Sequence, residues 1–371
     1  MEERTLYLLA LSMIKGLGPV NARNLIAYCG SEQAVFETPK GKLLRIPGIG
    51  EKNAALILEA DTLKEAEAEL EFCQKQGIRL ISYLDEAYPQ KLKFLKHAPL
   101  LLFVKGQIDF NAQPNIAIVG TRKCTDYGRS QAQEIASYFA QRGINVVSGL
   151  AYGIDIAAHR ASLAEGGITT AVLGHGLAHL YPAAHRQKAT QMLERGGLLT
   201  EFYSQVKPEA VNFPARNRII SGMSDAVIVV EAAETGGALI TAQFAFEQNR
   251  EVYAVPGRIG DPYSAGCNRL IGEQQARLLS HPQEVLDDLQ IQWQPLAEPA
   301  SAAAEQLSLD FGKDLSEHEH KVLSFLHRGE ALVDQISLHT AIPMHELNAL
   351  LLNMEFKGLL QQAPGKKFRR L

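Results

Sequence analysis

The sequence predicts an α/β protein built around an extended Rossmann-like sheet that is doubly wound and mostly parallel. Three observations on residues 79–276 lead to this prediction. Short apolar, β-branched runs alternate with stretches of helical pattern. The runs lack the apolar–polar alternation of half-exposed strands, which indicates strands covered on both faces. Almost every run ends in a turn with glycine, and ligands of such sheets bind at the carboxyl ends of the strands.

Pattern and composition divide the 371 residues into three domains and a linker. We expect a helical domain at residues 1–75, the Rossmann-like core at 76–292 and a winged-helix domain at 314–371. The linker at 293–313 is rich in Pro, Ala, Ser, Glu and Gln and has no periodic apolar pattern. A chain of this length exceeds one ordinary domain.

A short unit repeats in the N-terminal domain at an offset of 32 residues. Residues 14–18 read Ile-Lys-Gly-Leu-Gly, residues 46–50 read Ile-Pro-Gly-Ile-Gly, and Asn-Ala follows at the same distance in both copies. Two copies in register predict helix, tight turn, helix, and they resemble the helix-hairpin-helix (SAM-like) motif that holds DNA backbones. The alternative is a plain helical hairpin, since Lys15 and Lys52 alone supply charge near the turns.

The core elements are predicted from the alternating pattern. The strands are expected at residues 79–82, 101–105, 115–119, 144–147, 169–173, 197–201, 226–231 and 251–255. The helices are expected at residues 130–141, 154–165, 183–194, 238–248 and 268–276. The first turns of the helices that follow these strands would offer free backbone amides at the carboxyl ends of the strands. Such an arrangement suits the binding of phosphates.

The C-terminal residues predict a small domain of three helices and a hairpin. Helices are expected at residues 317–327, 332–339 and 344–357, the first with a capping box of Ser316 and Glu319. Residues 359–361 and 368–370 are expected to pair around Gly365, which resembles a winged helix. Lys366, Lys367, Arg369 and Arg370 crowd the hairpin. Duplex-DNA contact and a protein-interaction role both fit this cluster.

Charge and cysteine content narrow the class of protein. The net charge is −4, so a nucleic-acid site has to come from local clusters of Arg and Lys. The four cysteines are too far apart for a CxxC motif, and we interpret them as reduced thiols. The apolar run at residues 6–14 follows two glutamates and is too short to span a membrane, so we expect a cytoplasmic protein.

The turn after the strand at 115–119 favours phosphate binding by a side chain. It reads Gly-Thr-Arg-Lys-Cys-Thr-Asp-Tyr-Gly at residues 120–128. A dinucleotide site would have a second glycine where Arg122 stands. An arginine there obstructs close approach of a pyrophosphate to the backbone, but it can pair with a phosphate itself. The chain contains no P-loop signature, so we do not expect ATP hydrolysis.

The segment Asn-Phe-Pro-Ala-Arg-Asn-Arg at residues 212–218 supplies the parts of a single-strand site. Arg216 and Arg218 offer charge, Asn217 an amide and Phe213 a stacking face. The alternative is that Phe213 belongs to the core and the arginines cap a helix or pair with carboxylates. Lys207, in the preceding loop, could extend the groove.

Catalytic and metal-binding constellations are weak in this sequence. Asp155 and His159 lie four residues apart on a predicted helix but have no evident third ligand, so we predict neither a metal nor a cofactor. Glu201 and Glu231 end strands, where a lone carboxylate is more often a polar anchor than a base. No Ser/His/Asp or Cys/His arrangement has local support, and we expect no enzyme activity.

The core segments resemble the DNA processing protein A (DprA/Smf) family. The matching segments are Val-Gly-Thr-Arg at 119–122, Ser-Gly-Leu-Ala-Tyr-Gly-Ile-Asp at 148–155, Val-Leu-Gly-His-Gly at 172–176, Phe-Pro-Ala-Arg-Asn-Arg at 213–218, Gly-Gly-Ala-Leu-Ile-Thr at 236–241 and Val-Pro-Gly at 255–257. They occur in the family's order over about residues 115–275. Ala178 and the turn at 235–237 depart from the family's usual Asp and Ser-Gly-Ser-like turn.

The resemblance implies a single-stranded-DNA-binding protein that forms dimers, protects incoming DNA and loads the RecA recombinase onto it in natural transformation. It assigns DNA contacts to Gly120, Thr121, Arg122, Lys207, Phe213, Arg216, Asn217 and Arg218. The alternative is a Rossmann-like nucleotide phosphoribohydrolase of the lysine-decarboxylase-like kind. Such enzymes carry a Pro-Gly-Gly-x-Gly-Thr motif, and residues 234–238 of this chain match that motif poorly. A nucleoid protein that prefers duplex DNA is a third possibility.

Overall fold

The computed structural model describes residues 2–59, 61–293, 316–326, 329–356, 359–363 and 367–370. The linker predicted at 293–313 lies outside these residues except for Trp293. Gly365 and Lys366 of the predicted hairpin also lie outside them, as do the last residues, His327 and Lys357, of two predicted helices.

The N-terminal domain is helical, and its two repeated units have the same geometry. Its helices are α1 (Glu2–Met13), α2 (Pro19–Cys29), α3 (Glu32–Glu37), α4 (Lys40–Leu43), α5 (Glu51–Glu59) and α6 (Thr62–Lys75). Gly16 and Gly48 occupy equivalent turn positions with φ of 88° and 84°, a region that disfavours other residues. Leu17 and Ile49 follow them and are buried. The predicted pair of helical hairpins is therefore confirmed, with the apolar turn residue in the core.

One sheet of nine strands forms the centre of the described chain, in the order β1-β2-β6-β5-β4-β3-β7-β8-β9. The strands are β1 (Arg79–Ser82), β2 (Leu101–Gly106), β3 (Asn115–Val119), β4 (Asn145–Ser148), β5 (Thr169–Val172), β6 (Gly197–Thr200), β7 (Ala226–Val229), β8 (Glu251–Ala254) and β9 (Arg277–Leu278). The strands β6-β5-β4-β3-β7-β8-β9 pair in parallel with their neighbours. Strands β1 and β2 pair antiparallel with each other, and β2 pairs antiparallel with β6. The predicted mostly parallel sheet is confirmed.

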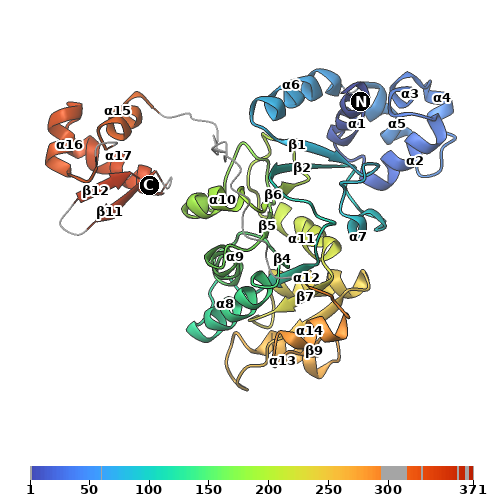
Figure 1. The fold of residues 1–371 in the computed structure, drawn as a ribbon. Helices are drawn as coiled ribbons and strands as arrows, with labels where there is room; N and C mark the ends of the chain where they lie inside the picture. Colours follow the sequence, from blue (N-terminus) through green and yellow to red (C-terminus); the bar gives the residue numbers. More distant parts are fainter. Residues whose placement is uncertain are drawn as a thin grey trace.

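Helices cover both faces of this sheet (Figure 1). Within the core, alternate residues of β3 point to opposite faces: Ile116 and Ile118 pack with α8 (Asp126–Ala140) and α9 (Ile154–Ala164). Ala117 and Val119 pack with α11 (Asn212–Met223) and α12 (Gly237–Glu247). The remaining core helices are α7 (Gln90–Lys93), η1 (Ala183–His185), α10 (Arg186–Met192), α13 (Ala265–Gly272) and α14 (Gln283–Asp288). Strands buried on both faces explain the apolar runs without alternation.

The strand order reverses at β3, which creates a switch point. After β3 the chain builds β4, β5 and β6 on one side, and it then returns to form β7 on the other side of β3. The turns after β3 and β7 therefore diverge to opposite faces and leave a crevice at the carboxyl ends of these strands. Crevices of this kind bind ligands in doubly wound sheets.

The described C-terminal residues form a winged helix, as predicted. Its elements are α15 (Glu317–Leu326), β10 (Ala331–Leu332), α16 (Val333–Thr340), α17 (Met344–Phe356), β11 (Leu360–Ala363) and β12 (Lys367–Arg370). The strands pair in the order β10-β12-β11. The predicted capping box is present: the Ser316 amide donates to Glu319 Oε2 at 2.8 Å, and the Glu319 amide donates to Ser316 Oγ at 3.3 Å.

Some elements escaped the sequence analysis or begin elsewhere. Helix α8 begins at Asp126, four residues before the prediction, because Thr125 Oγ1 accepts the Gly128 amide and caps it. Helix α11 contains the whole segment at residues 212–218, for which the sequence analysis predicted no helix. Among the residues that the structure describes, no helix is both long and apolar enough to cross a lipid bilayer.

Candidate functional site

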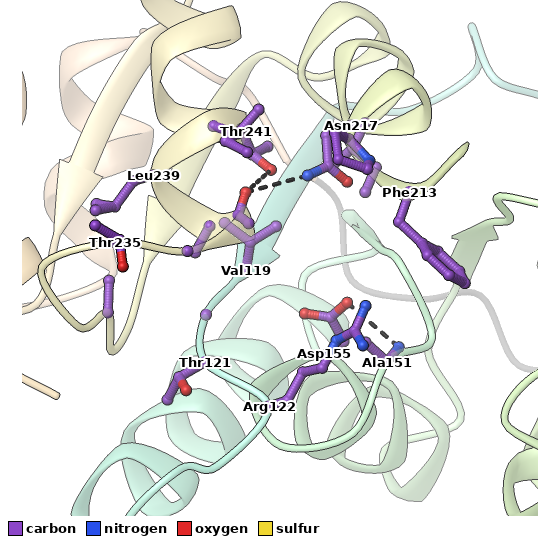
Figure 2. Close-up of a pocket in the computed structure, with 18 of the residues that line it drawn as sticks. Val119, Thr121, Arg122, Ala151, Asp155, Phe213, Asn217, Thr235, Leu239 and Thr241 are labelled. Carbon is purple, nitrogen blue, oxygen red and sulfur yellow. Dashed lines mark hydrogen bonds between the residues drawn. The ribbon is translucent and has the colours of Figure 1, made fainter. Parts of the chain in front are cut away.

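A pocket with a volume of about 1130 Å³ lies at the switch point, above the ends of β3 and β7. It is lined by residues 119–123 after β3, by residues 232–241 after β7 and by the first turns of α11. Figure 2 shows Thr121 and Arg122 on one side of this hollow, Thr235 and Leu239 on another and Phe213 on a third. The pocket thus collects segments that lie more than 100 residues apart in the chain.

Arg122 and Phe213, both predicted as site residues, meet at the rim. The guanidinium carbon of Arg122 lies 5.3 Å from the centre of the Phe213 ring, a cation–π distance. Arg122 is exposed, and in the described part of the chain it makes no ion pair. Tyr181 lies against Phe213 with ring centres 5.8 Å apart, and its own ring is 40% exposed. A cation and two aromatic rings, those of Arg122, Phe213 and Tyr181, therefore lie together at one edge of the pocket, which we call the rim.

The turn that carries Arg122 is held by backbone contacts. The Thr121 amide donates to the Glu231 carbonyl at 2.8 Å. A side chain at Gly120 would meet Ile154 and the Glu231 carbonyl, so this glycine allows the turn to pack closely on α9. The Glu231 carboxylate accepts the Thr125 amide at 2.9 Å and also the Thr125 hydroxyl. Glu231 is thus a buried anchor for this turn, which is the polar-anchor interpretation of a strand-end carboxylate.

Arg216 lines the pocket, but its charge is used within the protein. It is 3% exposed, and its guanidinium donates to the carbonyls of Gly149, at 2.9 Å, and Val172. Burial lowers the pKa of Arg216 to about 10, and the nearby Asp155 carboxylate opposes that shift. Burial likewise raises the pKa of Asp155, opposed by Arg216 and by the amides of Ala151 and Gly149. Burial and the two carbonyl contacts of Nη1 favour a structural role for Arg216, and its predicted phosphate contact stays a prediction.

Arg218 is also engaged within the protein, and it is not among the residues that line the pocket. It forms an ion pair with Glu201, whose pKa is raised by burial and lowered again by Arg218. This pair fits the alternative in which the arginine pairs with a carboxylate and Glu201 is a polar anchor, while the predicted phosphate contact of Arg218 stays a prediction. Asn217 lines the pocket, yet its amide donates to the Gly237 carbonyl at 3.1 Å. Lys207 is exposed in the loop before α11 but does not line the pocket.

The start of α12 completes the pocket, and the sequence analysis did not assign it. Gly236 is its N-cap with φ of 153°, and open space surrounds the position where a side chain would begin. Gly236, Gly237 and Ala238 line the pocket, and a helix start carries partial positive charge. Lys123 and Arg269 line the pocket as well and are exposed. The double glycine at 236–237 was the available signal, whereas nothing local marked Arg269 or Tyr181.

The Asp155 and His159 pair does not form a metal site. Asp155 accepts the backbone amides of Gly149 and Ala151 at 3.2 Å and 3.3 Å. His159 Nδ1 lies 2.7 Å from Thr169 Oγ1, and burial lowers the pKa of His159 to about 3. No group of three His, Cys, Asp or Glu side chains in the described chain is arranged to hold a metal ion. Both side chains therefore act as buried structural groups.

The fold and the pocket define a class: a Rossmann-like α/β protein with a pocket at its switch point, together with helix-hairpin-helix and winged-helix domains. Family models match all three parts. They are the DNA recombination-mediator protein A model over residues 79–290, the DprA winged-helix model over 298–366 and the SAM-like helix-hairpin-helix tandem over 8–60. The chain belongs to the DNA processing protein A (DprA/Smf) family.

Bacterial relatives match large parts of the chain. Protein Smf of Escherichia coli is 38% identical over 308 residues, which are 81% of this chain and 80% of that protein. The solved structure of DprA from Streptococcus pneumoniae has a TM-score of 0.64 at 35% identity and covers 76% of this chain and 96% of its own. A Helicobacter pylori DprA structure, described for its single-stranded DNA binding mode, has a TM-score of 0.52 at 27% identity and covers 58% of this chain and 97% of its own.

Proposed function

We propose that this chain is a single-stranded-DNA-binding protein, without catalytic activity, that protects incoming DNA and loads RecA onto it in natural transformation and recombination. The observation that carries the proposal is the unpaired Arg122 beside Phe213 and Tyr181 at the switch-point rim. Guanidinium and aromatic faces together are the parts of a sequence-tolerant single-strand site. Family membership and the described DNA binding of the Helicobacter pylori relative support it.

In the proposed complex, a base takes the place of the guanidinium on the Phe213 ring, and Arg122 turns to the adjacent phosphate. The turn at Gly120 and Thr121 and the start of α12 offer backbone amides along the same edge. Lys207 extends the positive charge along the loop before α11. Asn217 and Arg216 then line the wall of the site, with their hydrogen bonds kept inside the protein, and Arg218 stays paired with Glu201.

The remaining assignments rest on the family resemblance and belong to the same proposal. They are a homodimer, a RecA contact, a cytoplasmic location and the absence of a cofactor. The proposal includes a duplex-DNA contact through the winged helix, since Lys367 and Arg369 are exposed on β12. Arg369 donates from Nε and Nη2 to Gln361 Oε1, so it leaves part of its fork for a phosphate.

The experiment that tests the function is a competition titration. A labelled single strand is bound, and unlabelled single-stranded or duplex DNA of the same sequence is added. We expect unlabelled single-stranded DNA to displace the labelled strand far better than duplex DNA does. Equal or better displacement by duplex DNA would instead favour a nucleoid protein that prefers duplexes. A parallel incubation with nucleoside monophosphates should release no free base. Released base would instead support the phosphoribohydrolase alternative.

The affinity of the protein for single-stranded DNA should depend strongly on the salt concentration. For single strands, the slope of log K against log salt is about −0.7 for each phosphate neutralised. If Arg122, Lys123 and Lys207 each meet a phosphate, the slope should be about −2, measured by fluorescence anisotropy between low and moderate salt. A slope near zero would mean that these cations do not contact the backbone.

Replacing Phe213 with alanine should weaken strand binding by about 1–3 kcal/mol, because one stacked base loses its platform. Because Phe213 is partly exposed, the free energy of unfolding should change much less than for a core residue. Phe246, which is 58% exposed on α12 and does not line the pocket, supplies the matched control. If Phe213→Ala and Phe246→Ala bind equally well, no base stacks at Phe213.

A further inference from the structure

A buried carboxylate of the N-terminal domain binds the loop between β6 and α11 of the core. Glu69 belongs to α6, in its third turn, and is 5% exposed. Its two oxygens accept both donors of one residue in the core: the Ser204 amide donates to Oε1 at 2.7 Å, and the Ser204 hydroxyl donates to Oε2 at 2.6 Å. Cys73, one turn along α6, also lies 3.8 Å from Oε1. Hydrogen bonds to a charged acceptor are directional and stronger than neutral ones.

Ser204 lies in the loop between β6 and α11, and this loop packs on the loop after β5. The Gly176 amide donates to the Val206 carbonyl at 2.9 Å, and the Ala178 amide donates to the Ser204 carbonyl at 3.3 Å. A side chain at Gly176 would collide with the carbonyls of Tyr203 and Ser204, so the two loops touch along their backbones. A constraint on Ser204 is therefore passed to the loop after β5.

That second loop supports the aromatic pair of the rim. Gly174, at its start, approaches Phe213 so closely that a side chain there would come within 2.9 Å of the ring. Tyr181, at its end, packs on Phe213 with ring centres 5.8 Å apart. A continuous path of contacts thus runs from Glu69 through Ser204 to Tyr181 and Phe213.

The apolar core shows the same connection between the domains. One continuous cluster contains Leu8 and Leu25 of the helical domain together with Leu173 and Leu177 of the loop after β5. Apolar contacts hold the domains together but allow sliding, because they are not directional. The carboxylate fixes one position within this interface.

We propose that Glu69 is a positioning residue through which the N-terminal domain holds the Tyr181–Phe213 rim in its binding geometry. The N-terminal domain then contributes to strand affinity without touching the strand at this point. The proposal rests on the function proposed above for the rim. It assigns a role to this domain that is independent of its hairpin turns.

The test uses the full chain with three variants. Glu69→Ala removes the carboxylate, Glu69→Gln keeps an acceptor for the Ser204 amide, and Glu67→Ala removes an exposed carboxylate of the same helix as a control. Two quantities are measured: hydrogen exchange of the amides of Ser204, Gly176 and Ala178, and the affinity for an oligothymidine strand. Glu69→Ala should speed exchange and weaken binding about tenfold, because the loop that supports Tyr181 and Phe213 loses the hydrogen bonds that fix it. Glu69→Gln should restore most of both, and Glu67→Ala should change neither.

A double-mutant comparison separates positioning from general destabilisation. In a Phe213→Ala background the positioned ring is gone, so Glu69→Ala should cost much less affinity than in the wild type. An equal loss in both backgrounds, or unchanged exchange at Ser204, would overturn the proposal. A wild-type protein that binds no strand would refute the proposed function instead, and exchange at Ser204 would still decide whether Glu69 holds the rim.

Discussion

Replacing Arg122 with glutamate is expected to abolish strand binding while the protein stays folded. The side chain is exposed and its contact is with the Phe213 ring, so its loss removes little packing. A carboxylate in its place would face the phosphates, and like charges at an interface cost several kcal/mol, which corresponds to a loss of at least about a hundredfold in affinity. The measurement is a binding titration at fixed low salt.

The matched control places the same charge change at the other end of the parallel strands, where their amino-terminal residues lie. Arg195 precedes β6, and its guanidinium donates to the Gly166 carbonyl at 2.8 Å. Arg195→Glu should retain nearly wild-type affinity, because it lies at the amino-terminal ends of the strands. If Arg122→Glu and Arg195→Glu lose affinity equally, the protein acts through net charge, and the switch-point site is incorrect.

Replacing Arg216 with methionine should reduce the free energy of unfolding by about 3–5 kcal/mol, the usual cost of leaving a buried charge without its partner. The variant loses the donors to the Gly149 and Val172 carbonyls and leaves Asp155 buried without a cation. Urea unfolding followed by circular dichroism measures the change. Strand binding should weaken as well, since the loop after β4 packs against the turn that carries Arg122: a side chain at Gly153 would meet the Thr121 carbonyl.

A double variant distinguishes a structural arginine from a binding one. Asp155→Asn combined with Arg216→Met removes both charges and should be less destabilised than the sum of the single changes, because no uncompensated charge remains. If Arg216→Met keeps wild-type stability and loses only strand affinity, then Arg216 contacts phosphate after all. That result would contradict the buried network described here.

The fold could be predicted because its signals are local. The run at 115–119 coincides with β3, whose residues are all buried, since a strand covered on both faces is mostly apolar. The hairpin repeat was visible because a positive φ requires glycine at the same position in both copies. Helix α11 was missed because its polar residues face buried partners instead of solvent, which weakens the helical pattern.

The site could be predicted only in part, because the partners of an arginine are not encoded near it. Arg122, Arg216 and Arg218 are equivalent as residue types, yet one is exposed and two are occupied. The carboxylate that opposes the lowered pKa of Arg216 belongs to Asp155, 61 positions earlier and on a different element. The bond between Glu69 and Ser204 likewise spans 135 residues. Such pairs form only through tertiary packing, so the spacing of residues along the chain does not predict them.

The most direct test of the central claim is photo-crosslinking of a single strand that contains iodouracil, followed by mass spectrometry of the linked peptides. The account predicts crosslinks to peptides containing Phe213 or Tyr181 and to the turn at residues 120–123, and their loss in Arg122→Glu. Crosslinks confined to the winged helix or to the N-terminal hairpin turns would contradict it, because the strand would then lie away from the rim of the central sheet.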